Sequence, residues 1–246
     1  MRLLLDLGNT RLKWALQAQP EGWLARGAVD WREDTMAGLQ LAWSGLPRPD
    51  TVIAASVVDA VREALVAEVV GSLFARAPGW WRTPASACGV RNAYAEPQRL
   101  GVDRFLAMVA AYADGRAPCV LAGVGTALTL DALASDGRHL GGLIAPGPQL
   151  MRQSLLDATA KVRLDRPGEI LELADNTADA VVSGCFQAAA ALIERFATRM
   201  AARLDGAPTL ILGGGDAATL MPLLSLPARL SQDSVLRGLA VWANAQ

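Results

Sequence analysis

Two short glycine turns carry the residues best suited to bind phosphate. The first is Asp6-Leu7-Gly8-Asn9-Thr10 with Lys13 shortly after it, and the second is Gly125-Thr126-Ala127. A glycine lets the backbone turn without a side chain in the way, so the amides of the following residues can point at a phosphate. Together the turns favour a nucleoside triphosphate bound between two parts of the chain, but each turn alone also fits a plain hairpin. The chain contains no G-x-x-x-x-G-K-[ST] loop.

Two aspartates are candidates for metal and proton chemistry. Asp6 ends an apolar run, where a carboxylate is costly unless it faces a cation or hydrogen-bond donors. Asp103 and Arg104 follow Gly101 at the expected start of a helix. Asp103 could accept the proton of a substrate hydroxyl while Arg104 holds an anionic substrate. By spacing alone a simpler alternative stays open, in which Asp103 caps the helix and Arg104 pairs on the surface.

Strands and helices that position these turns follow from the apolar periodicity. We expect a loop over residues 77–100, which are rich in Pro, Gly and Trp, and a second half of the chain that opens near Pro118. Each glycine turn lies between two expected strands, so the pattern predicts a mixed α/β fold with two similar halves and a cleft between them. Strands are expected over residues 3–7, 11–16, 51–55, 119–122, 128–133, 140–145 and 208–212, and helices over 57–69, 102–113, 148–161, 177–204 and 233–245.

Composition excludes several classes of protein. The 246 residues are 52% hydrophobic and 19% charged, which argues against a disordered chain. The net charge of -1 comes without a basic stripe, so we expect no nucleic-acid partner. Asp6 interrupts the apolar start and no charge-free stretch is long enough for a membrane span, so we expect a cytoplasmic protein without a membrane partner. Three scattered cysteines and the single His139 argue against disulfides, zinc sites and histidine catalysis.

A third glycine cluster, Gly213-Gly214-Gly215, follows an expected strand and resembles the start of a dinucleotide fingerprint. Too little chain follows it for a complete dinucleotide fold, and no acidic residue stands at the required distance. The pattern therefore argues against a hydride-transfer enzyme. We expect this stretch to pack a helix tightly or to border an adenosine.

Five motifs, spread from residue 3 to about 216, occur in an order that resembles one enzyme family. The chain resembles the type III pantothenate kinases, which belong to the acetate kinase, hexokinase and actin superfamily. In chain order the motifs are Asp6-x-Gly8-Asn9-Thr10, Tyr94-x-x-Pro97-x-x-x-Gly101-x-Asp103-Arg104, Gly125-Thr126-Ala127-x-Thr129-x-Asp131, Gly141-Gly142-x-Ile144-x-Pro146-Gly147 and Asn176-Thr177-x-x-Ala180.

The resemblance implies ATP-dependent phosphorylation of pantothenate to 4′-phosphopantothenate, the first step of coenzyme A biosynthesis. It implies two actin/ribonuclease H-like halves, residues 1–115 and 116–246, with an interdomain nucleotide cleft. The cofactor would be MgATP. The protein would be a homodimer whose pantothenate pocket lies at the subunit interface.

The resemblance also implies a role for each matching residue. Asp103 would be the general base on the 4′-hydroxyl, and Asp6 would lie near the magnesium ion, through water. Arg104 is the candidate partner for the pantothenate carboxylate. The ATP site would comprise Asp6, Leu7, Gly8, Asn9, Thr10, Arg11, Leu12, Lys13, Gly125 and Thr126, and the pantothenate site Tyr94, Gly101, Val102, Asp103, Arg104 and Thr177.

One position departs from the family pattern. The family commonly has an aspartate two residues before the glycine of Gly125-Thr126-Ala127, where it helps to bind a monovalent cation such as potassium or ammonium. Here that position is Gly123, which has no side chain to offer. We therefore expect the cation site to be lost or rebuilt from backbone carbonyls, with a weak dependence on potassium.

Two alternatives to this function remain at the level of sequence. The first is a non-catalytic homologue that acts as a transcription-accessory or metabolite-sensing protein. The missing carboxylate at Gly123 is the sequence feature that favours this alternative. Retention of Asp6, Asp103 and Arg104 argues against it, because a protein that only binds has less use for a base. The second is a superfamily kinase for a sugar or an acyl acid, which usually has a longer chain.

Overall fold

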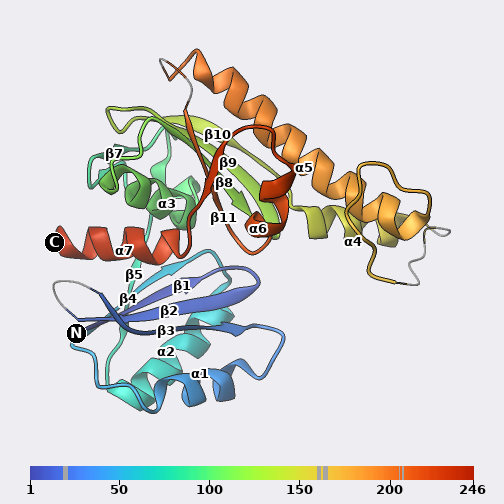
Figure 1. Ribbon diagram of the computed structural model, residues 1–246. Coiled ribbons are helices and arrows are strands. Elements are labelled where there is room, and N and C mark those ends of the chain that lie inside the picture. Colours follow the sequence, from blue (N-terminus) through green and yellow to red (C-terminus); the bar gives the residue numbers. More distant parts are fainter. Residues whose placement is uncertain (19–21, 160–161, 163–165, 205, 207) are drawn as a thin grey trace. The chain divides into compact units, whose positions relative to one another are not determined.

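The structure is a computed structural model that describes residues 1–18, 22–159, 162, 166–204, 206 and 208–246 (Figure 1). It contains two compact units, one of residues 1–114 and 233–246 and the other of residues 115–232. The family resemblance implies that residues 116–246 form one half, whereas in the structure residues 233–246 pack with the first unit. Each unit is built on one five-stranded sheet.

The sheet of the first unit has the strand order β3-β2-β1-β4-β5. The first three strands pair in antiparallel fashion, and β4 and β5 run parallel to β1. The tight turn after β1 thus reverses the direction of the chain, and β2 pairs with β1. The strands are β1 (Arg2–Leu7), β2 (Arg11–Gln17), β3 (Trp23–Asp30), β4 (Thr51–Ser56) and β5 (Pro78–Trp81).

Side chains of β1 alternate between two helical layers, which lie on opposite faces of this sheet in Figure 1. Leu3, Leu5 and Leu7 pack with α1 (Thr35–Trp43) and α2 (Ala60–Phe74). Leu4 packs instead with α3 (Val102–Ala113) and α7 (Ser234–Asn244). Because residues i and i+2 of a strand share a face, Asp6 lies on the same face as Leu4. The candidate carboxylate therefore faces the α3 and α7 layer.

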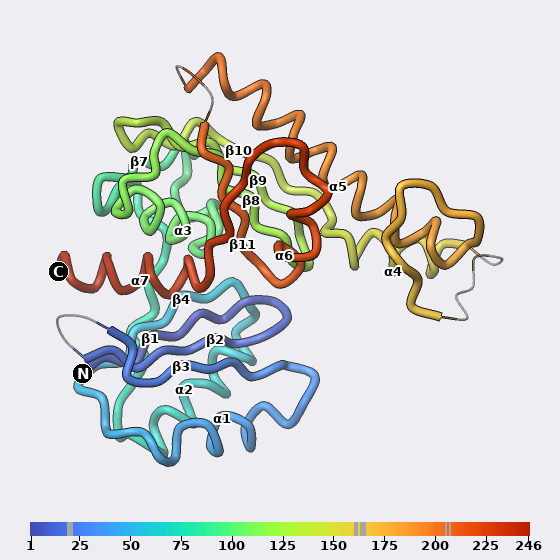
Figure 2. Tube along the Cα trace, in the orientation of Figure 1, coloured from blue at the N-terminus to red at the C-terminus, as the bar shows by residue number. Residues whose placement is uncertain are grey.

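The C-terminal helix α7 lies beside the N-terminal strands, as the red and blue ends of the tube show in Figure 2. Arg2 Nη1 donates a hydrogen bond to Asn244 Oδ1 at 2.6 Å, and Arg237 pairs with Asp114 at 2.6 Å. Gly238 contacts the backbone of Leu106 on α3 so closely that a Cβ atom there would collide with the Leu106 carbonyl. These contacts explain why the end of the chain belongs to the first unit.

The second unit repeats this topology. Its sheet has the order β10-β9-β8-β11-β12, with β8, β9 and β10 antiparallel and with β11 and β12 parallel to β8. The expectation of a mixed α/β fold with two similar halves is confirmed by this shared strand order. The strands are β8 (Cys119–Val124), β9 (Ala127–Leu133), β10 (His139–Pro146), β11 (Thr209–Gly213) and β12 (Ala228–Leu230).

The long helix α5 (Thr177–Ala201) forms the core of the second unit with this sheet. Val182, Phe186 and Ile193 are buried against the apolar face of β8 and β9. By length and composition alone α5 could cross a membrane, but half of its most apolar window is buried inside the unit, as in a core helix. The described residues of this unit also form α4 (Pro148–Ala158), α6 (Ala217–Leu220) and the 3-10 turn η2 (Met221–Leu223).

The expected loop over residues 77–100 is wrong in part. Its first residues form β5, which pairs with β4, and two short strands and a 3-10 turn follow. Expected helix 148–161 ends at Ala158, and residues 160–161 lie outside the described residues. The additional elements are β6 (Ser86–Ala87), β7 (Val90–Arg91) and η1 (Pro97–Arg99).

Candidate active site

The first glycine turn closes a tight hairpin between β1 and β2. Gly8 N donates to Arg11 O at 3.2 Å, and a Cβ atom at Gly8 would lie only 3.3 Å from the same oxygen. Trp31 fixes the turn from outside, because its Nε1 donates to Gly8 O at 2.6 Å and its backbone N donates to Thr10 O at 3.2 Å. Asn9, Thr10 and Arg11 are exposed at the tip, whereas Leu7 and Leu12 are buried in the core. Leu7 and Leu12 could therefore reach a nucleotide only through their backbone.

Asp6 and Lys13 lie directly opposite each other on the two strands of this hairpin. Burial raises the pKa of Asp6 to about 7, and the negative charges of Asp103 and Asp233 add to the increase while Lys13 opposes it. An aspartate ordinarily has a pKa near 3.9, so its surroundings strongly favour either a proton or a cation at this carboxylate. The three carboxylates all belong to the first unit: Asp6 lies on the sheet face toward α3 and α7, Asp103 is in the first turn of α3, and Asp233 immediately precedes α7.

The second motif forms the start of α3. Gly101 is the N-cap residue, and Asp103 stands in the first turn, where its Oδ1 accepts a hydrogen bond from Arg104 N at 2.8 Å. A Cβ atom at Gly101 would lie 2.5 Å from Asp103 Oδ1, so glycine at this position leaves room for the carboxylate. The positive end of the helix dipole stabilises a charged Asp103. Val102 is buried and anchors the turn to the core.

Arg104 is buried, with 6% of its surface exposed. Its Nη1 donates to the hydroxyl of Tyr94 at 3.2 Å, and its guanidinium lies 5.9 Å from the centre of the Tyr94 ring. Tyr94 is held in turn by a hydrogen bond from its backbone N to Asn92 Oδ1 at 2.9 Å. The alternative of a surface-paired Arg104 is therefore wrong. A buried arginine beside a tyrosine hydroxyl is well suited to bind a carboxylate.

In the second unit the turn after β8 is packed by two other glycines. Gly125 N donates to Ala127 O at 3.1 Å, and Thr126 is exposed. Gly147 N donates to Thr126 O at 2.9 Å, and a Cβ atom at Gly147 would collide with the Gly125 carbonyl. Gly214, with φ of +97°, lies against the Val124 carbonyl in the same way. Because Gly147 and Gly214 have no side chains, their backbone segments can pack directly against the turn that carries Thr126.

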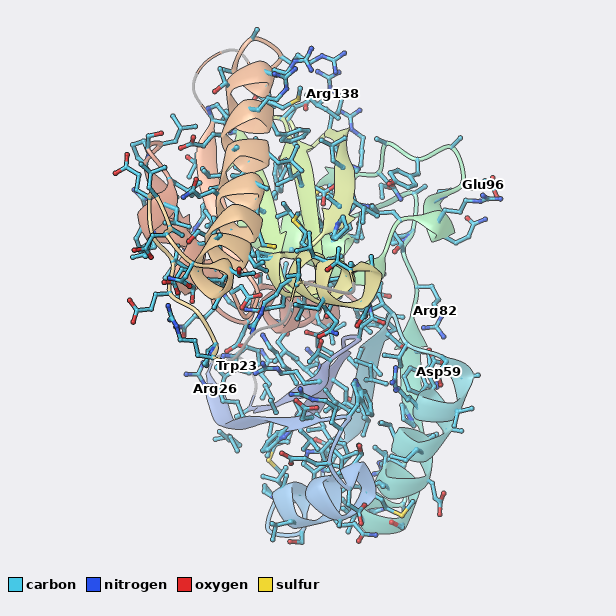
Figure 3. The ribbon with its side chains drawn as sticks, turned by 90° about the vertical axis from the view of Figure 1, so that its right-hand side faces the viewer. Trp23, Arg26, Asp59, Arg82, Glu96 and Arg138 are labelled. Carbon is cyan, nitrogen blue, oxygen red and sulfur yellow. The ribbon has the colours of Figure 1, made fainter. Side chains whose placement is uncertain are left out.

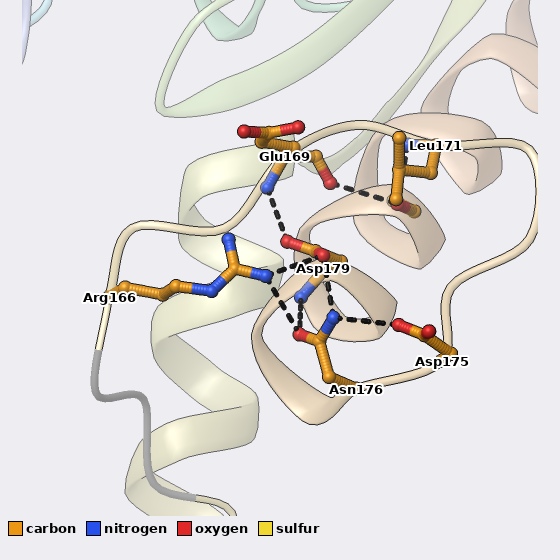
Figure 4. A network of polar contacts seen from close by, with 7 residues as sticks. Arg166, Glu169, Leu171, Asp175, Asn176 and Asp179 are labelled. Carbon is orange, nitrogen blue, oxygen red and sulfur yellow. Dashed lines mark hydrogen bonds and ion pairs between the residues drawn. The ribbon is translucent and has the colours of Figure 1, made fainter.

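Thr177 is exposed at the first position of α5 and lines a hollow of about 590 Å³ with Leu155 of α4. A polar network supports this helix start (Figure 4). Asp179 accepts hydrogen bonds from Arg166 Nη2 at 2.6 Å, Glu169 N at 2.7 Å and Asn176 Nδ2 at 2.7 Å. The Arg166 side chain, with the Asn176 and Glu169 hydrogen bonds, lowers the pKa of Asp179 to about 2.

The structure gathers part of the predicted site within each unit. The first unit holds the hairpin of residues 6–13, Tyr94 and residues 101–104, and the second holds Gly125, Thr126 and Thr177. One residue near Asp6 was missed from the sequence, namely Asp233. Its only signal was its place before the last expected helix, where an aspartate is ordinarily interpreted as a cap. The single histidine, His139, is buried and pairs with Asp131 at 2.8 Å.

The strand order that both sheets share defines a fold of the actin-like class. In structure the chain is similar to a glucokinase from an Antarctic psychrotroph, with a TM-score of 0.51, 13% identity, and coverage of 99% of this chain and 98% of the other. It is also similar to a Campylobacter jejuni protein described as a Baf family transcriptional activator, with a TM-score of 0.62, 19% identity, and coverage of 99% and 98%. At these identities the likeness concerns the fold alone.

The sequence comparisons give the family. The model of the type III pantothenate kinase family matches residues 2–199. Proteins named type III pantothenate kinase are 43% identical over 246 residues in Aromatoleum aromaticum, covering 99% of this chain and 98% of the relative, and 44% identical over 243 residues in Xanthomonas campestris pv. campestris, covering 98% and 96%. The chain belongs to the type III pantothenate kinase family.

Proposed function

We propose that this protein transfers the γ-phosphoryl group of MgATP to the 4′-hydroxyl of pantothenate, the first step of coenzyme A biosynthesis, in the cytoplasm. The observation that carries the proposal is the start of α3. There the carboxylate of Asp103 acts electrostatically on Asp6 of the phosphate hairpin, and the adjacent Arg104 is buried against Tyr94. A base, an anion-binding group and a phosphate turn thus belong to one unit.

Asp103 is the proposed general base. Phosphoryl transfer asks little covalent chemistry of the protein, which must position the groups and neutralise charge. The Asp103 carboxylate takes the hydroxyl proton as the attacking oxygen loses it. The hydrogen bond from Arg104 N to Oδ1 orients this carboxylate at the start of α3.

The surroundings of Asp6 fit a hydrated magnesium ion. A divalent cation in place of a proton would relieve the crowding of carboxylates that raises the pKa of Asp6 to about 7. Magnesium in kinases is typically bound by one or two carboxylates, water and substrate phosphates. When bound, it supplies charge neutralisation on the phosphates. Residues 8–11 and Thr126 would bind the phosphate groups, and of these Asn9, Thr10, Arg11 and Thr126 are exposed.

For pantothenate, we propose that Arg104 binds the carboxylate and that Tyr94 and Thr177 line the pocket. The family resemblance implies a homodimer with this pocket at the subunit interface. Exposed apolar side chains support such an interface: Ile144 on the edge strand β10 is 66% exposed, and Leu150 on α4 is 40% exposed. Exposed apolar side chains that gather on one surface often mark a protein interface. Light scattering coupled to size exclusion tests the dimer.

We further propose that the monovalent cation site of the family is absent or rebuilt from backbone carbonyls. Gly123 pairs with Thr129 on β9, and a Cβ atom at Gly123 would lie 2.6 Å from Thr129 Oγ1. The neighbouring hydroxyl therefore occupies the space that an aspartate would need. This packing fits a chain that has adapted to glycine at position 123.

The alternative of a non-catalytic homologue is not favoured, because the base, the hairpin carboxylate and the buried arginine are all present. The proposal is tested by incubating the protein with MgATP and pantothenate and identifying the product by mass spectrometry. We expect a mono-phosphorylated pantothenate. A pantothenate analogue without the 4′-hydroxyl should yield no such product, and phosphorylation of that analogue would contradict the assignment of the acceptor.

A further inference from the structure

We infer that Asp233 is a positioning residue that holds the ammonium group of Lys13 at the nucleotide side of the phosphate hairpin. This inference rests on the proposed function, since it assigns Lys13 to the phosphates of MgATP. Asp233 immediately precedes α7, far in sequence from the hairpin but in the same unit.

The contacts of Asp233 are made with two cations. Its Oδ1 lies 3.7 Å from Lys13 Nζ, and its Oδ2 accepts a hydrogen bond from Arg26 Nη1 at 2.9 Å. The side chain of Asp233 is 23% exposed and that of Lys13 is 34% exposed, so the pair is partly shielded from water. Figure 3 shows Arg26 at the edge of the sheet, on β3. The carboxylate thus links the edge strand to the hairpin strand.

Strand register explains why these side chains meet. Lys13 lies opposite Asp6, and Arg26 lies opposite Ala15, two residues beyond Lys13. Residues i and i+2 share a face, and directly paired residues on adjacent strands share it too. Ala15 packs with α7, so all of these side chains face that helix. The start of α7 brings Asp233 to the same face.

The backbone of Asp233 argues against an ordinary capping role. Asp233 is the N-cap residue of α7, yet its side chain makes no capping hydrogen bond. Its φ of +51° lies in the left-handed region, which costs energy for a residue with a Cβ atom, although less for aspartate and asparagine than for other residues. The side chain of Asp233 contacts Lys13 and Arg26 and does not cap α7. These two contacts therefore explain an aspartate at this position better than helix capping does.

This arrangement restricts a flexible side chain. Lysine carries its charge on a four-carbon stem and loses much rotamer freedom on binding a ligand. With Asp6 opposite and Asp233 beside it, the Lys13 ammonium is held before the nucleotide arrives, so binding costs less entropy. Arg26 offsets the negative charge of Asp233, so that this carboxylate does not repel the triphosphate.

The test is direct titration of the protein with a non-hydrolysable ATP analogue and magnesium, without pantothenate. Asp233→Asn should fold, because asparagine tolerates the left-handed region well. We expect its Kd for the analogue to rise roughly 3- to 5-fold, as loss of a partly exposed ion pair produces. Asp233→Glu, which keeps the charge, should recover part of the affinity. An unchanged or lower Kd in Asp233→Asn would overturn the inference.

Two further variants separate positioning from helix docking. Asp114→Asn removes the ion pair between α7 and α3 without touching Lys13, and it should leave the Kd unchanged. An equal loss in Asp114→Asn would show that only the docking of α7 matters. In a Lys13→Gln background, Asp233→Asn should have no additional effect, whereas additive losses would contradict an action through Lys13. Wild-type protein that binds the analogue but leaves pantothenate unphosphorylated would refute the proposed acceptor and leave this inference standing.

Discussion

Replacement of Asp103 by Asn tests whether the role of this carboxylate is catalytic or structural. Asparagine keeps an Oδ1 atom that can accept the 2.8 Å hydrogen bond from Arg104 N, so the start of α3 should retain its geometry. The amide cannot take up a proton in the way a carboxylate does. The same change removes one of the negative charges that raise the pKa of Asp6, so that pKa should fall.

The expected magnitudes differ sharply between turnover and stability. Loss of a general base typically costs about 10²- to 10⁴-fold in rate, equivalent to roughly 3–5 kcal/mol in the barrier. A carboxylate in the first turn of a helix contributes only about 0.3–1 kcal/mol to stability. For a chain of this size that corresponds to a decrease in Tm of about 1–4 °C. We therefore expect a folded but nearly inactive variant.

The assay measures kcat and the KM for MgATP and for pantothenate in wild type and Asp103→Asn, with thermal unfolding of both. We expect a large loss in kcat and a small change in Tm. Near-wild-type kcat would show that Asp103 only stabilises the first turn of α3. A collapse of Tm would show that the carboxylate is required for folding.

Four further predictions follow from other parts of the structure. Arg104→Lys keeps the charge but loses the fork-shaped donor set, so the KM for pantothenate should rise by about 10-fold or more; an unchanged KM would place the carboxylate elsewhere. Gly238→Ala should lower the free energy of unfolding in urea by about 1–3 kcal/mol through collision with Leu106, whereas Gly184→Ala, which meets no atom within 4 Å, should be neutral or stabilising. The pKa of Asp179 is lowered to about 2, so its contribution to stability is present above pH 4 and lost as the pH falls from about 4 to about 2; acid unfolding of Asp179→Asn should lack this dependence. At fixed ionic strength, exchange of potassium for a bulky organic cation should change the turnover rate little, and a steep rise with potassium would show that a cation site exists despite Gly123.

The sequence predicted best the elements whose signal is local. Helix α3 was expected over residues 102–113 and runs over Val102–Ala113, because Gly101 and the apolar periodicity mark its start and extent. The two glycine turns were placed correctly between strands for the same reason. In contrast, β5 contains Pro78 and Gly79, which argue against a strand, and its pairing with β4 over a long sequence separation stabilises it instead.

The candidate site could be predicted only where its residues stand close together in the sequence. Gly101, Asp103 and Arg104 form one motif, and their proximity was visible from spacing. Asp233 could not be found in this way, because the register of β1, β2 and β3 and the docking of α7 bring it to Lys13. The burial of Arg104 was likewise undetermined, since a charged residue at a helix start is usually exposed.

A pantothenate kinase couples ATP cleavage to pantothenate, and ADP release from MgATP with and without pantothenate measures this coupling directly. The account predicts ADP release that requires pantothenate and is lost in Asp103→Asn. A folded wild-type protein that releases no ADP when pantothenate is added would contradict the account and favour a non-catalytic homologue.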